Sequence, residues 1–184
     1  SMTINYSKNV KKTEKKQREE IQKSIRELDD MIRNVRAYFQ RIKQRSRLSN
    51  ERQKTDLRLE AMIPFVIEKK SIFVHAYEAR QIESAVNWAR ENDLKIIIVG
   101  GADSWRLTDL LVKNNIPVIL DKVEKVPFRR FEQIHLPYKI PYLLKQGGVQ
   151  FCINTRIGYP HDGNVRNLPN EAMRAAAYGL EKTE

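Results

Sequence analysis

The chain has 184 residues, of which 41% are hydrophobic and 31% are charged, a composition typical of folded globular proteins rather than disordered ones. Its single cysteine excludes an internal disulfide framework and a cysteine-based zinc site. No apolar run approaches the roughly 20 residues that cross a bilayer, and the N-terminus shows no signal peptide, so we expect no membrane partner and leave the compartment open.

The formal net charge of +11 is concentrated in the first third of the chain. Residues 1–60 hold 17 basic and 9 acidic side chains, whereas residues 61–184 hold 17 and 14. A basic arm can bind nucleic acid or another anionic surface. Here the basic residues alternate with acids and glutamines, and no aromatic ladder accompanies them. A solvated helix face is therefore the favoured interpretation, and a nucleic-acid partner is not expected.

The sequence pattern of residues 1–54 predicts a long basic amphipathic helix followed by a linker. Apolar residues recur in steps of four and three from Ile21 to Ile42, and no glycine or proline occurs before Pro64, so one helix over about residues 10–46 is expected. Such a stripe is typical of a coiled-coil seam, which makes a homo-oligomer plausible. It is equally typical of one helix that lies against a larger body.

Residues 55–184 predict a second helix, capped by Asp56 or Thr55, and then βα repeats. The apolar runs SIFVHA, KIIIVGGA, IPVIL and VQFCINT are expected as strands. Helices are expected over residues 78–93, 103–115, 140–148 and 168–180, with an irregular piece over 121–139. This alternation and the continuous apolar strands predict a parallel sheet with right-handed crossovers. Four βα units cannot close an eight-stranded barrel, so the alternatives are an open sheet or part of something larger.

Two segments of the repeat region resemble a known family. Residues 74–120, VHAYEARQIESAVNWARENDLKIIIVGGADSWRLTDLLVKNNIPVIL, resemble the second half of the barrel in metal-dependent amidohydrolases of the imidazolonepropionase-like group. Residues 166–184, RNLPNEAMRAAAYGLEKTE, are similar to the helix that follows the last barrel strand in that group. The resemblance implies an α/β fold of parallel βα units, a partial TIM-like (β/α) barrel preceded by the long basic helix, with the His-x-His metal pair of the family lying before residue 1.

The resemblance implies that the chain is part of a longer protein. That protein would hydrolyse C–N bonds in a cyclic amide or a peptide-like substrate. Family enzymes use one or two divalent metal ions to acidify a water molecule and to polarise the scissile group, with zinc as the expected metal. The present chain would hold only half of such a site. We therefore expect it to be inactive as a hydrolase on its own.

The resemblance assigns roles to a few residues. His75, at the end of the first predicted strand, stands where the family has its fifth-strand metal histidine. His161 and Asp162, in the loop after the last strand, are the nearest base and acid for a catalytic role, although YPHDG is also ordinary turn chemistry. Arg156 and His135 are candidates for lining the substrate pocket.

Two strand ends depart from the family pattern. The sixth strand of the family ends in histidine, but here Gly100-Gly101 takes that place. The last strand of the family ends in an aspartate, but here Asn154, Thr155 or Arg156 lies there, and an arginine repels a metal ion. The glycines lack the dinucleotide-binding spacing and more simply allow a tight turn.

Two alternative functions follow from these departures and from the basic helix. One is a non-catalytic relative that keeps the barrel, has lost the metal, and serves as a binding or scaffold module. The other is a protein whose basic helix docks on nucleic acid or on a partner helix.

Four side chains outside the metal positions carry expectations of their own. Asp103 is expected to cap the helix over 103–115. Arg129 and Arg130 can meet a substrate carboxylate, but surface exposure is the default for both. Cys152 is expected to be buried within its strand and inert.

Overall fold

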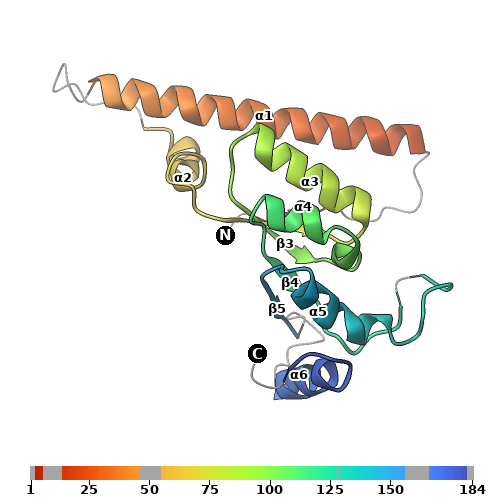
Figure 1. Cartoon of the computed structure of the whole chain (residues 1–184). Coiled ribbons are helices and arrows are strands. Elements are labelled where there is room, and N and C mark those ends of the chain that lie inside the picture. The colour runs from red at the N-terminus through yellow and green to blue at the C-terminus, as the bar shows by residue number, and fades with distance from the viewer. Residues whose placement is uncertain (1–2, 6–13, 46–54, 128, 156–165, 182–184) are drawn as a thin grey trace. The chain divides into compact units, whose positions relative to one another are not determined.

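The computed structural model describes residues 3–5, 14–45, 55–127, 129–155 and 166–181 (Figure 1). The predicted site residues Arg156, His161 and Asp162 lie outside these ranges. No helix in the described ranges is long and apolar enough to cross a membrane.

The chain divides into two compact units. One comprises residues 7–71 together with 91–95, and the other comprises residues 1–6, 72–90 and 96–184. The domain boundary after residue 54 that the sequence suggests stays a prediction.

The first unit is helical and contains α1 (Glu14–Arg45) and α2 (Leu57–Val66). The α1 helix is unbroken over 32 residues, as its apolar period predicts (Figure 1). Asp56 caps α2, because its side chain accepts hydrogen bonds from the backbone N–H groups of Arg58 and Leu59 at 3.0 and 3.5 Å. The predicted cap is therefore confirmed.

Residues 91–95 complete the helical unit through polar contacts with α1. The Arg36 guanidinium donates to the backbone oxygen of Asn92 at 2.6 Å, and the Asn92 amide donates to Asp29 at 3.1 Å. Lys69 forms an ion pair with Asp93. Polar side chains in the middle of α1 therefore bond to residues 91–95, in addition to the contacts of its apolar stripe.

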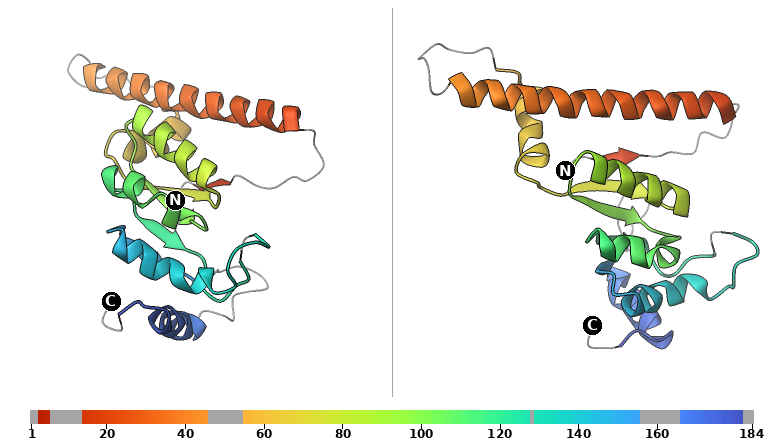
Figure 2. Two further views of the ribbon diagram at one scale, coloured as in Figure 1. Left: turned by 45° about the vertical axis from the view of Figure 1, so that its right-hand side comes forward. Right: turned by 45° about the horizontal axis from the view of Figure 1, so that its top comes forward.

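The second unit is built on one parallel sheet (Figures 1 and 2). Its strands are β1 (Thr3–Asn5), β2 (Ile72–Ala76), β3 (Ile96–Gly100), β4 (Val118–Leu120) and β5 (Phe151–Ile153). They lie side by side in chain order, and every neighbouring pair is parallel. Its helices are α3 (Ala79–Glu91), α4 (Thr108–Lys113), α5 (Leu136–Gln146) and α6 (Leu168–Ala177), with a 3-10 turn η1 (Ser104–Arg106).

The sheet has one well-buried face. In β2 and β3 every second residue is buried, beginning with Ile72 and Ile96, and the residues between them are half-buried. In a parallel sheet whose strands follow chain order, right-handed crossovers place the connecting helices on one face. The buried residues therefore face the helices, and we call the other face the inner face.

Four details of the elements differ from the sequence expectations. The α5 helix begins at Leu136, inside the segment over 121–139 that the sequence predicts to be irregular. The β1 strand was not predicted. The helix expected over residues 103–115 is a 3-10 turn followed by the short α4, and Asp103 makes no side-chain capping bond to the turn. Cys152 is exposed rather than buried, because it is the middle residue of β5 and points away from the better-covered neighbours on either side of it.

Candidate functional site

The carboxyl ends of β2 and β3 are joined by backbone hydrogen bonds that continue beyond the strands. The Gly101 N–H donates to the Ala76 oxygen, and the Asp103 N–H donates to the Tyr77 oxygen, both at 2.9 Å. The Asp103 carboxylate also accepts from the Ala79 N–H, in the first turn of α3, at 3.0 Å. Because parallel strands present their carboxyl ends at one edge, this is the edge where a site is expected.

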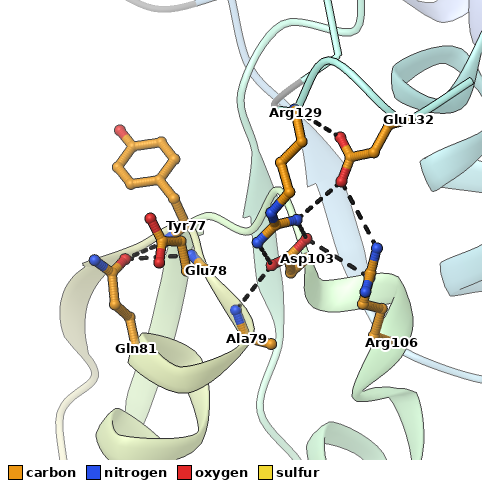
Figure 3. Close-up of polar contacts among 8 residues, drawn as sticks. All are labelled: Tyr77, Glu78, Ala79, Gln81, Asp103, Arg106, Arg129 and Glu132. Carbon is orange, nitrogen blue, oxygen red and sulfur yellow. Dashed lines mark hydrogen bonds and ion pairs between the residues drawn. The ribbon is translucent and has the colours of Figure 1, made fainter. Parts of the chain in front are cut away.

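Arg129 brings the long segment between β4 and α5 to the same edge. Its guanidinium makes a two-pronged bond to Asp103, with Nη1–Oδ1 and Nη2–Oδ2 distances of 2.8 and 2.7 Å. Nη1 also donates to Glu132 at 2.8 Å, and the Arg129 N–H donates to the same carboxylate at 3.0 Å. Figure 3 shows the guanidinium between the two carboxylates, with Arg106 beside them. Asp103 and Arg129 together thus link the segments that follow β2, β3 and β4.

The charges of this cluster are matched. Asp103 is only 1% exposed, so burial alone would favour its neutral form. The Arg129 guanidinium outweighs that effect and lowers the pKa of the Asp103 carboxyl below its ordinary value, while the carboxylates raise the pKa of Arg129. Asp103 is therefore an ionised, fully engaged hydrogen-bond acceptor at neutral pH. A carboxylate held in this way is a poor general base, because its pKa lies far below neutrality.

Gly100, the last residue of β3, lies against an aromatic ring. Its φ of +105° is a conformation that residues with side chains rarely adopt. A Cβ added there would lie 2.6 Å from Cε1 of Tyr77, well inside van der Waals contact. No side chain can therefore project from this strand end without moving Tyr77 and changing the backbone.

Tyr77 is itself held at the start of α3. The Gln81 side-chain oxygen accepts hydrogen bonds from the backbone N–H groups of Tyr77 and Glu78 at 3.0 and 3.2 Å (Figure 3). A glutamine that reaches back to the residues before a helix satisfies donors that the helix leaves unpaired. The tyrosine backbone is thus fixed from both sides, by Gln81 and by Asp103.

His75 lies on the inner face, one residue before the end of β2. It is half-buried, and the residues on either side of it, Val74 and Ala76, are buried on the opposite face. In the register of the sheet, His75 is level with Val99 of β3. The imidazole therefore leaves the sheet on the side away from the helices.

The other predicted site residues do not join His75 in the described structure. His135 lies at the start of α5, where its Nδ1 is 3.0 Å from the Tyr178 hydroxyl and its ring stacks on that tyrosine. Thr155, just beyond β5, is 6% exposed. Arg156, His161 and Asp162 lie outside the described residues.

The residues that the structure describes do not fit a metal centre. Among them, no three His, Cys, Asp or Glu side chains come together in a group that could hold a metal ion. The position level with His75 on the next strand is Val99, whose side chain cannot bind a metal ion. His75 is a single imidazole, and a stable zinc site needs three or four protein ligands.

Sequence reasoning missed the residues that organise this edge. Arg129 was expected at the surface, and Asp103 was expected as a helix cap; both are corrected by their mutual bond. The signal available in the sequence was weak, because the two residues are 26 positions apart. Tyr77 had a clearer signal, since an aromatic residue that follows one strand can cover glycines at the end of the next.

Comparison with known proteins gives one finding about the fold. No family model and no curated protein matches the chain. Among solved structures, the chain is similar to the crystal structure of an amidohydrolase from Thermotoga maritima MSB8, with a TM-score of 0.69 over 86% of this chain and 40% of that one. The sequences are 19% identical, so the likeness concerns the fold alone.

The chain has an amidohydrolase-like fold. The predicted fold class, an α/β arrangement of parallel βα units that forms part of a (β/α) barrel, is therefore confirmed. The chain spans 40% of the length of the solved amidohydrolase. Membership of the imidazolonepropionase-like group stays a prediction.

Proposed function

We propose that the chain is a metal-free, amidohydrolase-like binding module rather than a hydrolase. The observation that carries this proposal is the end of β3, where Gly100 adopts a left-handed backbone and the Tyr77 ring fills the space of a side chain. The family that the sequence resembles has a metal histidine at this strand end. Here the sequence has a glycine at that strand end, and a Cβ added to it would lie 2.6 Å from the Tyr77 ring, which supports the proposal.

A second observation supports a binding role. The one acidic side chain at the end of β3, Asp103, is engaged by Arg129 and by the Ala79 N–H. It organises the loops of the edge and is not available to take a proton from water. An edge whose loops are tied together in this way is suited to holding a ligand in place, because the geometry of its loops is fixed before binding.

The ligand class that we propose is a small molecule or peptide with amide groups, in keeping with the fold. The test is a panel of cyclic amides and short peptides, each measured in two assays with the same protein. A member that raises the melting temperature without being cleaved supports the module, because a ligand that binds only the folded state stabilises it. Zinc-dependent cleavage would contradict it, and so would the absence of any stabilising member.

The position of His75 favours a second candidate, a metal-dependent hydrolase of C–N bonds formed by a longer protein. The imidazole lies near the carboxyl edge on the inner face, which is where a barrel presents its site. This candidate needs further ligands from beyond the described residues. It predicts zinc-dependent turnover that is lost in His75→Ala, whereas the binding module predicts none in either protein.

A role for the basic N-terminal helix in docking nucleic acid or a partner helix remains the third candidate. It predicts binding to DNA or RNA that falls steeply with salt, since phosphate contacts release counterions. A flat salt response would exclude it.

A further inference from the structure

Arg106 is a second guanidinium at the carboxyl edge, and it is bonded less closely than Arg129. It is the last residue of η1, in the segment that follows β3. Its side-chain nitrogens lie 3.8 Å from Asp103 and 3.7 Å from Glu132 (Figure 3). Both distances exceed the roughly 2.7–3.2 Å of an N–H···O hydrogen bond. Among the described residues no acceptor takes a hydrogen bond from this side chain, so its N–H donors are available to a ligand.

The guanidinium of Arg106 is held in place before any ligand arrives. Its Cζ lies 4.8 Å from the centroid of the Trp105 ring, which is a cation–π contact. Asp103 and Glu132 attract the same group at longer range. Because the side chain is already ordered by these contacts, binding an acceptor costs less conformational entropy than it does for a freely moving surface arginine.

The charged cluster of Arg106, Arg129, Asp103 and Glu132 presents its positive members to solvent. The two arginine side chains are 41% and 28% exposed, whereas the two carboxylate side chains are 2% and 5% exposed. The part of the cluster that meets water is therefore positive and attracts an anion. Two guanidiniums and two carboxylates carry no net charge together, so an anion with one negative charge fits better than the doubly charged phosphate.

We propose that Arg106 binds the C-terminal carboxylate of a peptide at the carboxyl edge. A planar guanidinium offers paired N–H donors that match the two oxygens of a carboxylate. Arg129 is not the receptor, because its guanidinium is already bonded to Asp103 and Glu132. The inference rests on the proposed function, which supplies the amide groups of the ligand, and it adds the free carboxylate and the residue that recognises it.

The test uses the short peptides of the binding panel in matched forms. Each peptide is N-acetylated, which removes the charge of its amino end, and is made both as the free acid and as the C-terminal amide. Titration calorimetry with the unmodified chain is expected to show the free acid binding at least about tenfold more tightly than the amide, because only the acid makes charge-assisted hydrogen bonds with Arg106.

The matched variants are Arg106→Gln and Arg90→Gln, since Arg90 is an exposed arginine in the last turn of α3. The first is expected to lose the preference for the free acid and the second to keep it. Arg106→Lys, which has the charge without the paired donors, should keep only part of it. The ratio of the two affinities is the readout, because a change in folding alone weakens both forms alike. Circular dichroism establishes folding, and if Arg106→Gln does not fold, the unmodified chain and Arg106→Lys decide.

Each contrary result has its own meaning. A free acid and an amide that bind the unmodified chain equally would overturn the inference and leave the proposed function standing, since both forms would still be bound. A preference that persists in Arg106→Gln would place the carboxylate on another residue, and inorganic phosphate that displaces the free acid at equal concentration would assign the site to phosphate. Peptides that bind in neither form would contradict the proposed function and this inference with it.

Discussion

Arg129, Asp103 and Glu132 form a cluster that we call the clamp. Replacing Arg129 by methionine removes the guanidinium from the clamp and keeps most of the apolar stem. In the folded protein that guanidinium makes three hydrogen bonds of 2.7–2.8 Å to two carboxylates. Asp103 is 1% exposed, and the Glu132 side chain is 5% exposed. The variant therefore leaves two buried negative charges close together with little water to solvate them.

The size of the effect follows from burial. Breaking a buried ion pair by removing one partner costs about 3–5 kcal/mol. The Arg129 side chain is 28% exposed, which screens its charge, and Arg106 already lies 3.8 Å from Asp103 and can partly replace it. We therefore expect a loss at or below the lower end of that range, about 2–3 kcal/mol, which is large beside a total stability of about 5–15 kcal/mol.

Urea unfolding followed by circular dichroism measures this loss, and the neighbouring Arg130, which is exposed, gives the matched control. Arg130→Met is expected to change the free energy of unfolding by less than about 0.5 kcal/mol. In a double-mutant cycle with Asp103→Asn, the two substitutions should show a coupling of about 1–3 kcal/mol. If Arg129→Met costs no more than Arg130→Met, or if the two clamp substitutions simply add, Arg129 is a surface residue and the reasoning is wrong.

The dependence on pH gives a second measure of the same clamp. The pKa of Asp103 is lowered in the folded state, chiefly by its bond to Arg129. A lowered pKa contributes stability that is present above the unfolded value, about 4 for an aspartate, and is lost as the pH falls through the folded value. The difference in stability between the unmodified chain and Arg129→Met should therefore be full at neutral pH and shrink in acid.

Three further substitutions test other parts of the structure. Gly100→Ala should destabilise the protein by about 2 kcal/mol or more, since its Cβ would lie 2.6 Å from Tyr77 and its φ is +105°; restored stability on adding Tyr77→Ala would confirm that the ring causes part of the loss. Asp56→Ala should cost about 1 kcal/mol through the lost cap of α2, and no change would show that the cap is idle. Glu171→Ala should cost about 1–3 kcal/mol, because its buried carboxylate accepts from the Glu124 N–H at 2.7 Å; a neutral result in thermal or urea unfolding would contradict that role.

The strands β2 to β5 were predictable because each is a short apolar run between polar helices. The long α1 was predictable for a related reason, since its period of apolar residues continues without a glycine or proline. Both are local properties of the sequence. The parallel order of the strands then followed from the spacing of the βα units and the right-handed crossover rule.

The features that were not predicted depend on pairings between distant residues. The β1 strand has three residues and pairs with β2 seventy positions away, so no local apolar pattern indicates it. Arg129 lies in a charged irregular segment, and only the folded chain brings it to Asp103. The exposure of Cys152 depends on which face of β5 is covered, and an apolar run does not reveal that.

The candidate site was predictable only as a location. The strand ends named from the sequence lie at one edge of the parallel sheet, and the glycine at the place where the resembled family has a histidine was visible in the sequence. What the sequence did not show is that the Tyr77 ring lies against Gly100, where a Cβ would come within 2.6 Å of it. The structural role therefore belongs to a residue that sequence comparison with the family does not single out.

Zinc stoichiometry tests most directly whether the carboxyl edge is a metal centre. The protein is produced in medium supplemented with zinc, purified without chelators, and measured by plasma mass spectrometry beside His75→Ala. The closure of the β3 end by Tyr77 predicts far less than one zinc per chain, with no difference between the two proteins. About one zinc per chain, lost in His75→Ala, would contradict the metal-free module.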